Sequence, residues 1–277
     1  MANNNEFYPM NSGICVIIYD NEREQEFEKV NNFFSNTGFT VLPQIALLTG
    51  NDHNSEFLAT KEIKSIVHLY ASGYDHSEYD AFAFILISNK RVFENISIGS
   101  EIIFPFTRTD KLKNKPKLFF FDFNNKPIVS DVKENEENYY NEDVDLDGHP
   151  FSKSDESIAA SSSEAKQLDR IDFLNKLPMH KDILVAYFIF NNNSNATKQT
   201  ESTFLNELNY SLEILENNTN IEICQLLTWL NSKVEELDEV PNDINKKSNQ
   251  IMGFLSFLRK SFHFKKFQNH SILDNFV

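Results

Sequence analysis

The sequence predicts an α/β fold built on a mostly parallel sheet of six strands with helices on both faces. Three observations support this fold class. Short continuous apolar runs are typical of strands that are buried on both faces. Amphipathic stretches with helical spacing lie between these runs. The two kinds of segment alternate along much of the chain, which is the order of βαβ units.

The first half of the chain contains three of the predicted strands and two helices. The run GICVIIY at 13–19 predicts the first buried strand, and AFAFILIS at 81–88 the third. Between them, FTVLP at 39–43 predicts the second strand. One helix is expected over 24–37, where Gly38 ends it, and another over 58–72. Their apolar faces contain Phe27, Val30, Phe33 and Phe34 in the first helix and Ile63, Ile66, Val67 and Tyr70 in the second.

The second half of the chain supplies the remaining three strands and two more helices. KLFFF at 117–121 predicts the fourth strand and DILVAYFIF at 182–190 the fifth. Helices are expected around 201–216 and 221–237, and the last apolar segment, IMGFLSFL at 251–258, predicts the sixth strand. The apolar face of the second of these helices consists of Ile223, Leu226, Leu227 and Leu230.

Residues 131–170 interrupt the alternating pattern. The stretch at 131–148 is acidic, and 152–167 is rich in serine and alanine, so neither has enough apolar residues to order itself. We therefore expect a flexible linker at 131–170 within one domain. The domain would consist of residues 1–130 and residues 171–277, which contribute strands to the same sheet.

Composition excludes several classes of function. A formal net charge of −15 argues against nucleic-acid binding and against an anionic membrane surface. No apolar run approaches the ~18 residues of a membrane span, and no signal peptide is evident. Two cysteines are too few for a disulfide framework, so we expect a cytoplasmic protein.

No cofactor or metal site is expected. DVDLDG at 143–148 resembles the start of a calcium-binding loop, but its twelfth position holds Ser154 instead of a glutamate. Cys15 lies within a predicted buried strand and Cys224 beside an apolar helix face, and neither has a nearby cation that would lower its pKa. Both cysteines are expected to pack in the core.

Five ordered segments resemble those of the caspase family. YPMNSGICVII at 8–18 resembles the family's start, and YDHSEYDAFAFILISNK at 74–90 is similar to its Asp-His-Ser segment. KPKLFFFDFNNK at 115–126 resembles KPKLFIIQACRG without gaps. LPMHKDILVAYFIF at 177–190 and QIMGFLSFLRKSFHF at 250–264 resemble the start and end of the family's small subunit. The resemblance implies the six-stranded caspase sheet and a cysteine endopeptidase ancestry.

The catalytic positions implied by this resemblance are altered. The family's catalytic histidine falls on Asn89 and its catalytic cysteine on Asn124. An amide cannot act as a nucleophile or shuttle a proton at neutral pH, so the resemblance implies a pseudoenzyme.

The substrate pocket implied by the resemblance is altered as well. The pocket glutamine of the family falls on Asp122, where a negative charge would repel an anionic substrate residue. Lys198 is the only cation in the loop after the fifth strand, and no arginine lies between Arg170 and Arg259. Arg23, in the short connection after the first strand, falls outside the position of the family's other pocket arginine.

We therefore expect a non-catalytic caspase homologue that regulates apoptotic or immune caspase activity by pairing with an active caspase. About a dozen residues precede the first strand, so pairing is expected through the caspase-like domain. One alternative is an active caspase-type cysteine endopeptidase with a displaced site, or an endopeptidase with a relocated nucleophile such as Ser88. Another is a homodimeric scaffold or peptide-binding module.

Two further regions are implicated in partner contacts. The final strand is apolar on both faces, as expected of a strand packed under helices. The resemblance implies that it lies at the sheet edge and pairs with the same strand of a second protomer, so we expect it to form the dimer interface. The predicted interface residues are Gly253, Phe254, Leu255, Ser256, Phe257 and Leu258. In the linker, Asp145 and Asp147 end the tetrapeptides EDVD and VDLD and are candidate sites for cleavage by an active caspase.

Overall fold

The computed structural model describes residues 6–48, 53–89, 92, 95–125, 180–191, 203–217, 220–238 and 250–265. These residues belong to one compact unit formed by Met1–Pro127 and Leu177–Val277. The predicted linker at 131–170, with Asp145 and Asp147, lies outside the described residues, and so does Lys198.

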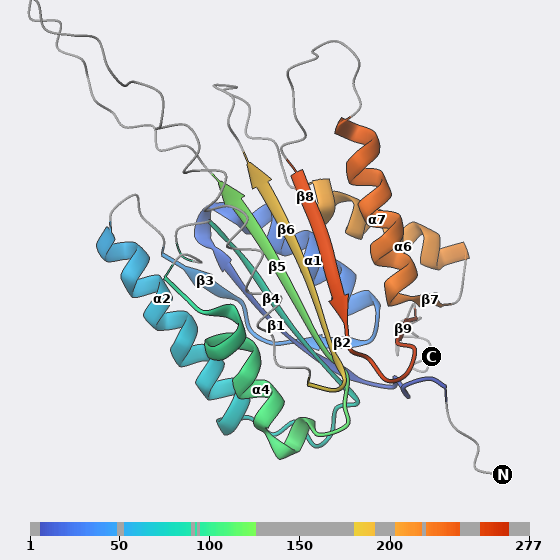
Figure 1. Cartoon of the computed structure of the whole chain (residues 1–277), viewed down its shortest axis with the longest axis horizontal. Helices are drawn as coiled ribbons and strands as arrows, with labels where there is room; N and C mark the ends of the chain where they lie inside the picture. Colours follow the sequence, from blue (N-terminus) through green and yellow to red (C-terminus); the bar gives the residue numbers. More distant parts are fainter. Residues whose placement is uncertain are drawn as a thin grey trace, which may run out of the picture. The chain divides into compact units, whose positions relative to one another are not determined.

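A sheet whose main path of six strands has the order β2-β1-β4-β5-β6-β8, with a seventh short strand beside β1, forms the centre of the unit (Figure 1). Five of these strands are parallel, and β8 pairs with β6 in the antiparallel direction. The predicted six-stranded, mostly parallel sheet is confirmed. The strands are β1 (Gly13–Asp20), β2 (Phe39–Val41), β4 (Ala81–Asn89), β5 (Lys117–Asn125), β6 (Ile183–Asn191) and β8 (Gln250–Ser256).

The edge of the sheet beside β1 is longer than the sequence predicted. After β2, a second short strand, β3 (Ile45–Leu47), pairs with the carboxyl half of β1. Pro43 lies between β2 and β3 and has no amide hydrogen for a sheet hydrogen bond, which explains the interruption. The expectation of a single strand at 39–43 therefore missed β3.

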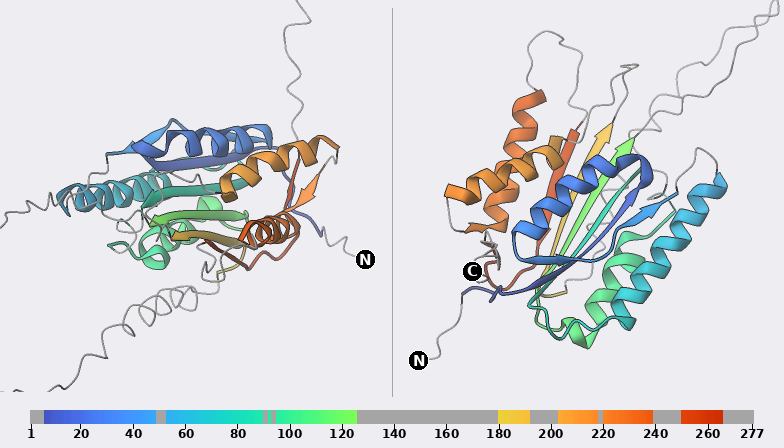
Figure 2. Two further views of the ribbon diagram at one scale, coloured as in Figure 1. Left: turned by 90° about the horizontal axis from the view of Figure 1, so that it is seen from above. Right: turned by 180° about the vertical axis from the view of Figure 1, so that it is seen from behind.

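Helices cover both faces of the sheet, as predicted (Figure 2). One face is covered by α1, α6 and α7, and the other by α2, α4 and the helical turns beside them. The α2 helix begins at His53 and continues as a π-helical turn, η2, to Gly73, so it starts five residues before the predicted 58–72. The other helical bounds are η1 (Asn21–Arg23), α1 (Glu24–Asn36), η3 (Ile98–Ile103), α4 (Phe104–Arg108), η4 (Asp110–Leu112), α6 (Thr203–Asn217) and α7 (Ile223–Asp238).

The α1 helix illustrates how the sequence sets these elements. Its four predicted apolar residues are buried against the sheet: Phe27, Val30, Phe33 and Phe34. The helix is followed by Gly38, whose φ of 88° lies in the left-handed region that favours glycine. The Gly38 carbonyl then accepts a hydrogen bond from Gly13 N at 2.9 Å, which starts the pairing of β2 with β1.

Aromatic side chains fill the layer on the α2 and α4 face. The ring of Phe106, on α4, lies 4.5 Å from that of Phe82, 5.6 Å from Phe84 and 6.0 Å from Phe119. All four side chains are fully buried. Alternate residues of β4 and β5 therefore pack on α4, as expected of parallel strands that are covered on both faces.

Two segments far apart in the chain meet beyond the amino ends of the parallel strands. Phe7 forms a parallel bridge with Ser261, where Tyr8 N donates to Ser261 O at 3.1 Å and Ser261 N to Glu6 O at 2.9 Å. A second, two-stranded sheet pairs β7 (Ile221–Glu222) with β9 (His263–Phe264). The first and last described segments are thus joined by backbone hydrogen bonds.

Candidate functional site

The two positions that the resemblance predicts to be altered catalytic positions lie side by side at the carboxyl edge of the sheet. Asn89 is the last residue of β4, and its Cα partner in β5 is Asn124. In open α/β sheets, ligand sites form outside the carboxyl ends of the parallel strands. The register therefore brings together the two positions that the sequence resemblance had assigned to one site.

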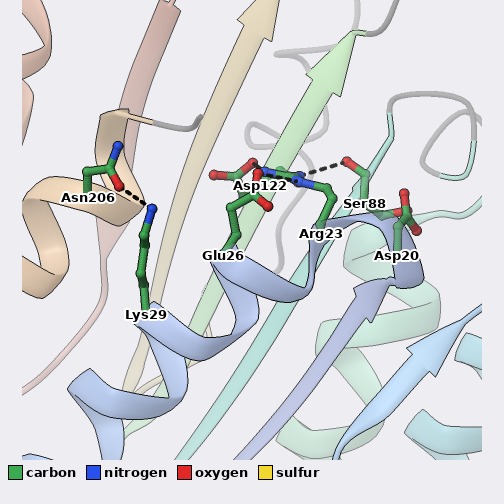
Figure 3. Close-up of polar contacts among 7 residues, drawn as sticks. All are labelled: Asp20, Arg23, Glu26, Lys29, Ser88, Asp122 and Asn206. Carbon is green, nitrogen blue, oxygen red and sulfur yellow. Dashed lines mark hydrogen bonds and ion pairs between the residues drawn. The ribbon is translucent and has the colours of Figure 1, made fainter. Parts of the chain in front are cut away.

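A buried ion pair lies directly beneath this edge (Figure 3). Arg23 Nη2 lies 2.7 Å from Asp122 Oδ1, and each side chain is only 3–4% exposed. Arg23 Nε also bonds Glu26 Oε1 at 3.1 Å, and Nη1 is 3.4 Å from the Asp122 carbonyl and 3.5 Å from that of Ser88. The guanidinium therefore connects η1, α1, β4 and β5.

Charge compensation stabilises this arrangement. Burial by itself would lower the pKa of Arg23, but the carboxylates of Asp122 and Glu26 outweigh that effect, so the pKa is raised and the guanidinium stays charged. The negative charge expected at Asp122 is therefore compensated within the fold, and the place of Asp122 in a substrate pocket stays a prediction. Its partner is Arg23, which the sequence comparison had set aside.

A second buried polar pair lies between β1 and β4. Ser88 Oγ donates to Asp20 Oδ1 at 2.6 Å, and neither side chain is accessible to solvent. Ser88 was the candidate for a displaced nucleophile. A nucleophile has to reach the substrate carbonyl, so this burial makes a catalytic role for Ser88 unfavourable.

The sequence contained a signal for these contacts. Asp20, Ser88 and Asp122 are polar residues close to the carboxyl ends of three neighbouring strands of one sheet, so the sheet order places them near one another.

A polar contact also holds the helix that follows Arg23. Lys29 Nζ on α1 donates to Asn206 Oδ1 on α6 at 2.5 Å (Figure 3).

Neither cysteine has the environment of a reactive thiol. Cys15 is fully buried in β1, and burial raises its pKa. Cys224, on α7, is half-buried, and burial also raises its pKa although a hydrogen bond with Ser256 works in the opposite direction. Within the described ranges no cluster of three or more His, Cys, Asp or Glu side chains could hold a metal ion.

The predicted interface segment lies at the opposite edge of the sheet from β2. Among the described strands, β8 pairs only with β6, so no described strand lies along its other side. The strand ends at Ser256, and Phe257 and Leu258 follow it. Ser256 is exposed, while Gly253, Phe254, Leu255, Phe257 and Leu258 are half-buried. The strand lies at an edge of the described sheet, as expected, but the expectation that it is packed under helices is corrected, because its residues are only half-buried or exposed.

Each face of β8 contacts different parts of the molecule. Met252 and Phe254 pack against the core cluster on the α7 side. On the other face, the Tyr187 ring lies over Gly253, where a Cβ atom would overlap the ring. Glycine at 253 thus lets β8 and β6 pair closely.

Comparison with known proteins identifies the family. A family model described as "Caspase domain" matches residues 12–263. The chain belongs to the caspase domain family. Two solved structures have the same fold: "Crystal Structure of drICE" (TM-score 0.56, 18% identity, 93% of this chain and 94% of that chain) and "structure of pro-sf-caspase-1" (TM-score 0.54, 16% identity, 95% of this chain and 100% of that chain). A search of curated protein sequences gave no match.

Membership of the caspase family confirms the resemblance that the five sequence segments implied. The roles of Asn89 and Asn124 as altered catalytic positions remain a prediction from that resemblance. In the part of the chain that the structure describes, no helix is long and apolar enough to cross a membrane.

Proposed function

We propose that this caspase-family domain is non-catalytic and regulates an active caspase by pairing with it. The observation that carries the proposal is the register of Asn89 with Asn124 at the carboxyl edge. The resemblance assigns the family's catalytic histidine and cysteine to these two positions. Two asparagines in this place cannot supply a thiolate and a proton shuttle.

The size of the expected loss makes residual catalysis negligible. Removing one member of a catalytic unit that acts together costs about 10⁴–10⁶ in rate. Both members are replaced here. The thiol of Cys15, which lies within β1, is fully buried.

The state of Arg23 supports the same conclusion for substrate binding. A ligand carboxylate could use this guanidinium only by displacing Asp122 and Glu26 from a buried pair. Leaving one buried charge unpaired costs about 3–5 kcal/mol. Arg23 is therefore a structural residue in this chain, and the carboxyl edge offers no free arginine among its described residues.

The open edge of β8 is the surface proposed for pairing. Phe257 N donates to Ile183 O at 2.7 Å, so Phe257 bonds toward β6. Bonding direction alternates along an antiparallel strand, which turns the amide hydrogen of Ser256 away from β6. An exposed edge with free amide and carbonyl groups is a template for a second strand.

The experiment measures the activity of caspases from the same organism after addition of the purified protein. Caspase activity should change with saturable dose, and a complex should elute in size-exclusion chromatography. Replacement of Ser256 by proline removes the outward amide hydrogen and should abolish both effects. Replacement by alanine keeps the amide hydrogen, so Ser256→Ala is the matched control and should behave like the unmodified chain.

Three results would redirect the proposal. Turnover of aspartate-containing peptides by the protein alone would favour the displaced-site endopeptidase. Self-association that Ser256→Pro abolishes, without any caspase binding, would favour the homodimeric scaffold. Equal caspase binding by the proline and alanine variants would remove β8 as the pairing surface.

A further inference from the structure

Positive charge is concentrated in three short segments of an otherwise acidic chain. Residues 108–117, 180–182 and 259–260 contain eight of the 26 lysines and arginines and only two acidic residues. Their formal charge is +6, whereas the whole chain carries −15, so the remainder carries −21. We call these three segments the basic edge.

The fold brings these segments together at the amino ends of β5 and β6. Arg259 Nε and Nη2 bind the two carboxylate oxygens of Asp182 at 2.8 and 2.5 Å, and Nη2 also lies 3.1 Å from Asn114 Oδ1. Tyr8 donates its hydroxyl hydrogen to the same carboxylate. This network fixes the three segments relative to one another.

An aromatic contact adds the end of α4 to the same surface. The guanidinium carbon of Arg108 lies 3.6 Å from the centre of the Phe104 ring, which in turn lies 5.3 Å from the His180 ring. His180 directly precedes the exposed Lys181. The basic edge is therefore continuous from α4 to the start of β6.

Most of the positive charge on this edge is exposed. Arg108, Lys113, Lys181 and Lys260 are exposed, and Arg259 is 46% exposed although it holds Asp182. Lys111 lies 4.0 Å from Asp75, which offsets one charge. Lys115 and Lys117 direct their ammonium groups to backbone carbonyls, and no carboxylate of a described residue lies at bonding distance from either group.

The pKa shifts of buried groups on this edge agree with an excess of positive charge. Burial is the main cause of the lowered pKa of His180, and the charges of Arg108 and Lys117 lower it further. Burial likewise lowers the pKa of Lys117 to about 8, Asp182 partly opposes that shift, and Arg259 adds to it. Each group is thus less easily protonated beside these cations.

We propose that the basic edge is a docking surface for a short acidic peptide. Lysine and arginine side chains that project from one edge match a run of carboxylates. A long polyanion such as nucleic acid would extend past the edge onto the remainder with its charge of −21, where it is repelled. A short peptide stays within the positive surface, since charges beyond a Debye length of about 8–10 Å are screened.

The occupant is an acidic segment of a partner protein, and an acidic stretch of this chain would compete with it for the same surface. Residues 131–148 contain eight acidic residues and one lysine, a net charge of −7. A tethered segment competes at a high effective concentration. The experiment therefore needs one arm in which the chain's own acidic residues are neutral.

The test titrates a labelled peptide of about twelve residues, with glutamate and glycine in alternation, and follows fluorescence anisotropy at about 50 mM salt. The full chain is compared with a variant whose acidic residues at 131–148 are changed to their amides. Each is also made with Lys113→Glu and Lys181→Glu, which should weaken binding about tenfold or more. Lys61→Glu with Lys64→Glu on α2 makes the same change in net charge and should have little effect on binding.

The two arms distinguish the source of the ligand. Equal binding of the probe to the amide variant and to the unmodified chain supports a partner protein as the source of the peptide. Tighter binding to the amide variant overturns that source and assigns the surface to residues 131–148. The proposal is overturned if the amide variant binds the probe no better than a glutamine-for-glutamate analogue. It is also overturned if the α2 variant weakens binding as much, or if a short oligonucleotide of equal charge binds more tightly than the peptide.

Discussion

Each end of the sheet holds a buried aspartate paired with an arginine, but the two pairs differ in what surrounds the arginine. At the carboxyl edge, Arg23 is as buried as Asp122. Its guanidinium bonds two carboxylates and two backbone carbonyls, all from the first half of the chain. At the amino edge, Arg259 is 46% exposed while Asp182 is buried. The first pair is closed to ligands, and the second is open to water and surrounded by further cations.

This difference in burial gives the two aspartate–arginine pairs different roles in stability. A fully buried pair contributes to the fold only while both partners are present, since either charge alone would be desolvated without compensation. A pair with an exposed arginine is partly screened by solvent, so losing it should cost less. In this molecule the carboxyl edge, where related folds place ligands, has the structural pair.

The largest effect is expected from removing one member of the closed pair. Arg23→Met removes the cation that is paired with the buried Asp122 carboxylate and should lower the free energy of unfolding by about 3–5 kcal/mol. Urea unfolding followed by circular dichroism measures this loss. Arg259→Met should cost clearly less, because solvent reaches that side chain. Equal losses in the two variants would contradict the comparison.

A paired replacement separates charge from packing at the closed pair. The double variant Arg23→Met with Asp122→Leu removes both charges together and should recover most of the stability lost in Arg23→Met. Replacing a buried pair by apolar groups of similar size is often close to neutral. If the double variant is as unstable as the single one, the bonds to Glu26 and to the two carbonyls account for the loss.

A pH effect is expected at the amino edge and concerns Lys117. Burial lowers the pKa of Lys117 to about 8 in the folded protein, whereas a lysine of the unfolded chain has a pKa of about 10.4. Between these values the unfolded state binds more protons, so the stability rises with pH, by about 2 kcal/mol by pH 9.5. Above pH 10 the raised pKa of Tyr8, about 12, acts in the opposite direction.

The Lys117→Met variant isolates this contribution. Unfolding free energies of both proteins between pH 7 and 9.5 should diverge, with a rise in the unmodified chain that is absent from the variant. If the unfolding free energies of the two proteins change with pH in parallel, the burial of the charged Lys117 side chain does not lower the stability.

A smaller effect is expected from the backbone of Asp182. Its φ of 66° lies in the left-handed region, where it forms a bulge with Phe257: Asp182 N donates to Phe257 O at 3.0 Å. Asn tolerates this conformation better than alanine does, so Asp182→Ala should be less stable than Asp182→Asn by about 1 kcal/mol. Thermal or urea unfolding of the two variants measures the difference. No difference would place the role of Asp182 entirely in its carboxylate.

No gain in activity is expected from restoring the catalytic residue types alone. The variant with Asn89→His and Asn124→Cys should remain inactive toward aspartate-containing peptides, because Arg23 stays bonded to Asp122 and Glu26. Assays with an active caspase as positive control test this expectation. Robust cleavage by the double variant would show that the closed pair does not prevent substrate binding.

The strands and helices were predictable because their apolar periodicity is strong. The runs at 13–19, 81–88 and 182–190 left little choice but buried strands, and the order of elements fixed a parallel sheet. β3 was missed since three residues after a proline carry too little pattern to be assigned. The partial exposure of β8 was missed because an apolar sequence does not say how far neighbouring helices extend over it.

Only those contacts of the candidate site that follow from the pairing of two neighbouring strands could be predicted from the sequence. The sequence alignment placed Asn89 and Asn124 on strand ends, and adjacent parallel strands then make them neighbours. The partner of Asp122 depended on the conformation of the short η1 turn, which three residues of sequence do not specify. For the same reason the convergence of Tyr8, Asp182 and Arg259, which are far apart in the chain, was visible only in three dimensions.

The bridge between Phe7 and Ser261 bears on how the protein is made in the cell. During synthesis the amino-terminal segment has no partner until residues about 250 positions later leave the ribosome. The edge of β5 likewise stays unpaired until β6 has been synthesised, because 57 residues separate Asn125 from Ile183. At roughly 5–20 residues per second this delay lasts about 3–12 s. Throughout that time the phenylalanine-rich edge of β5 is unpaired, and the nascent chain should depend on chaperones to avoid aggregation.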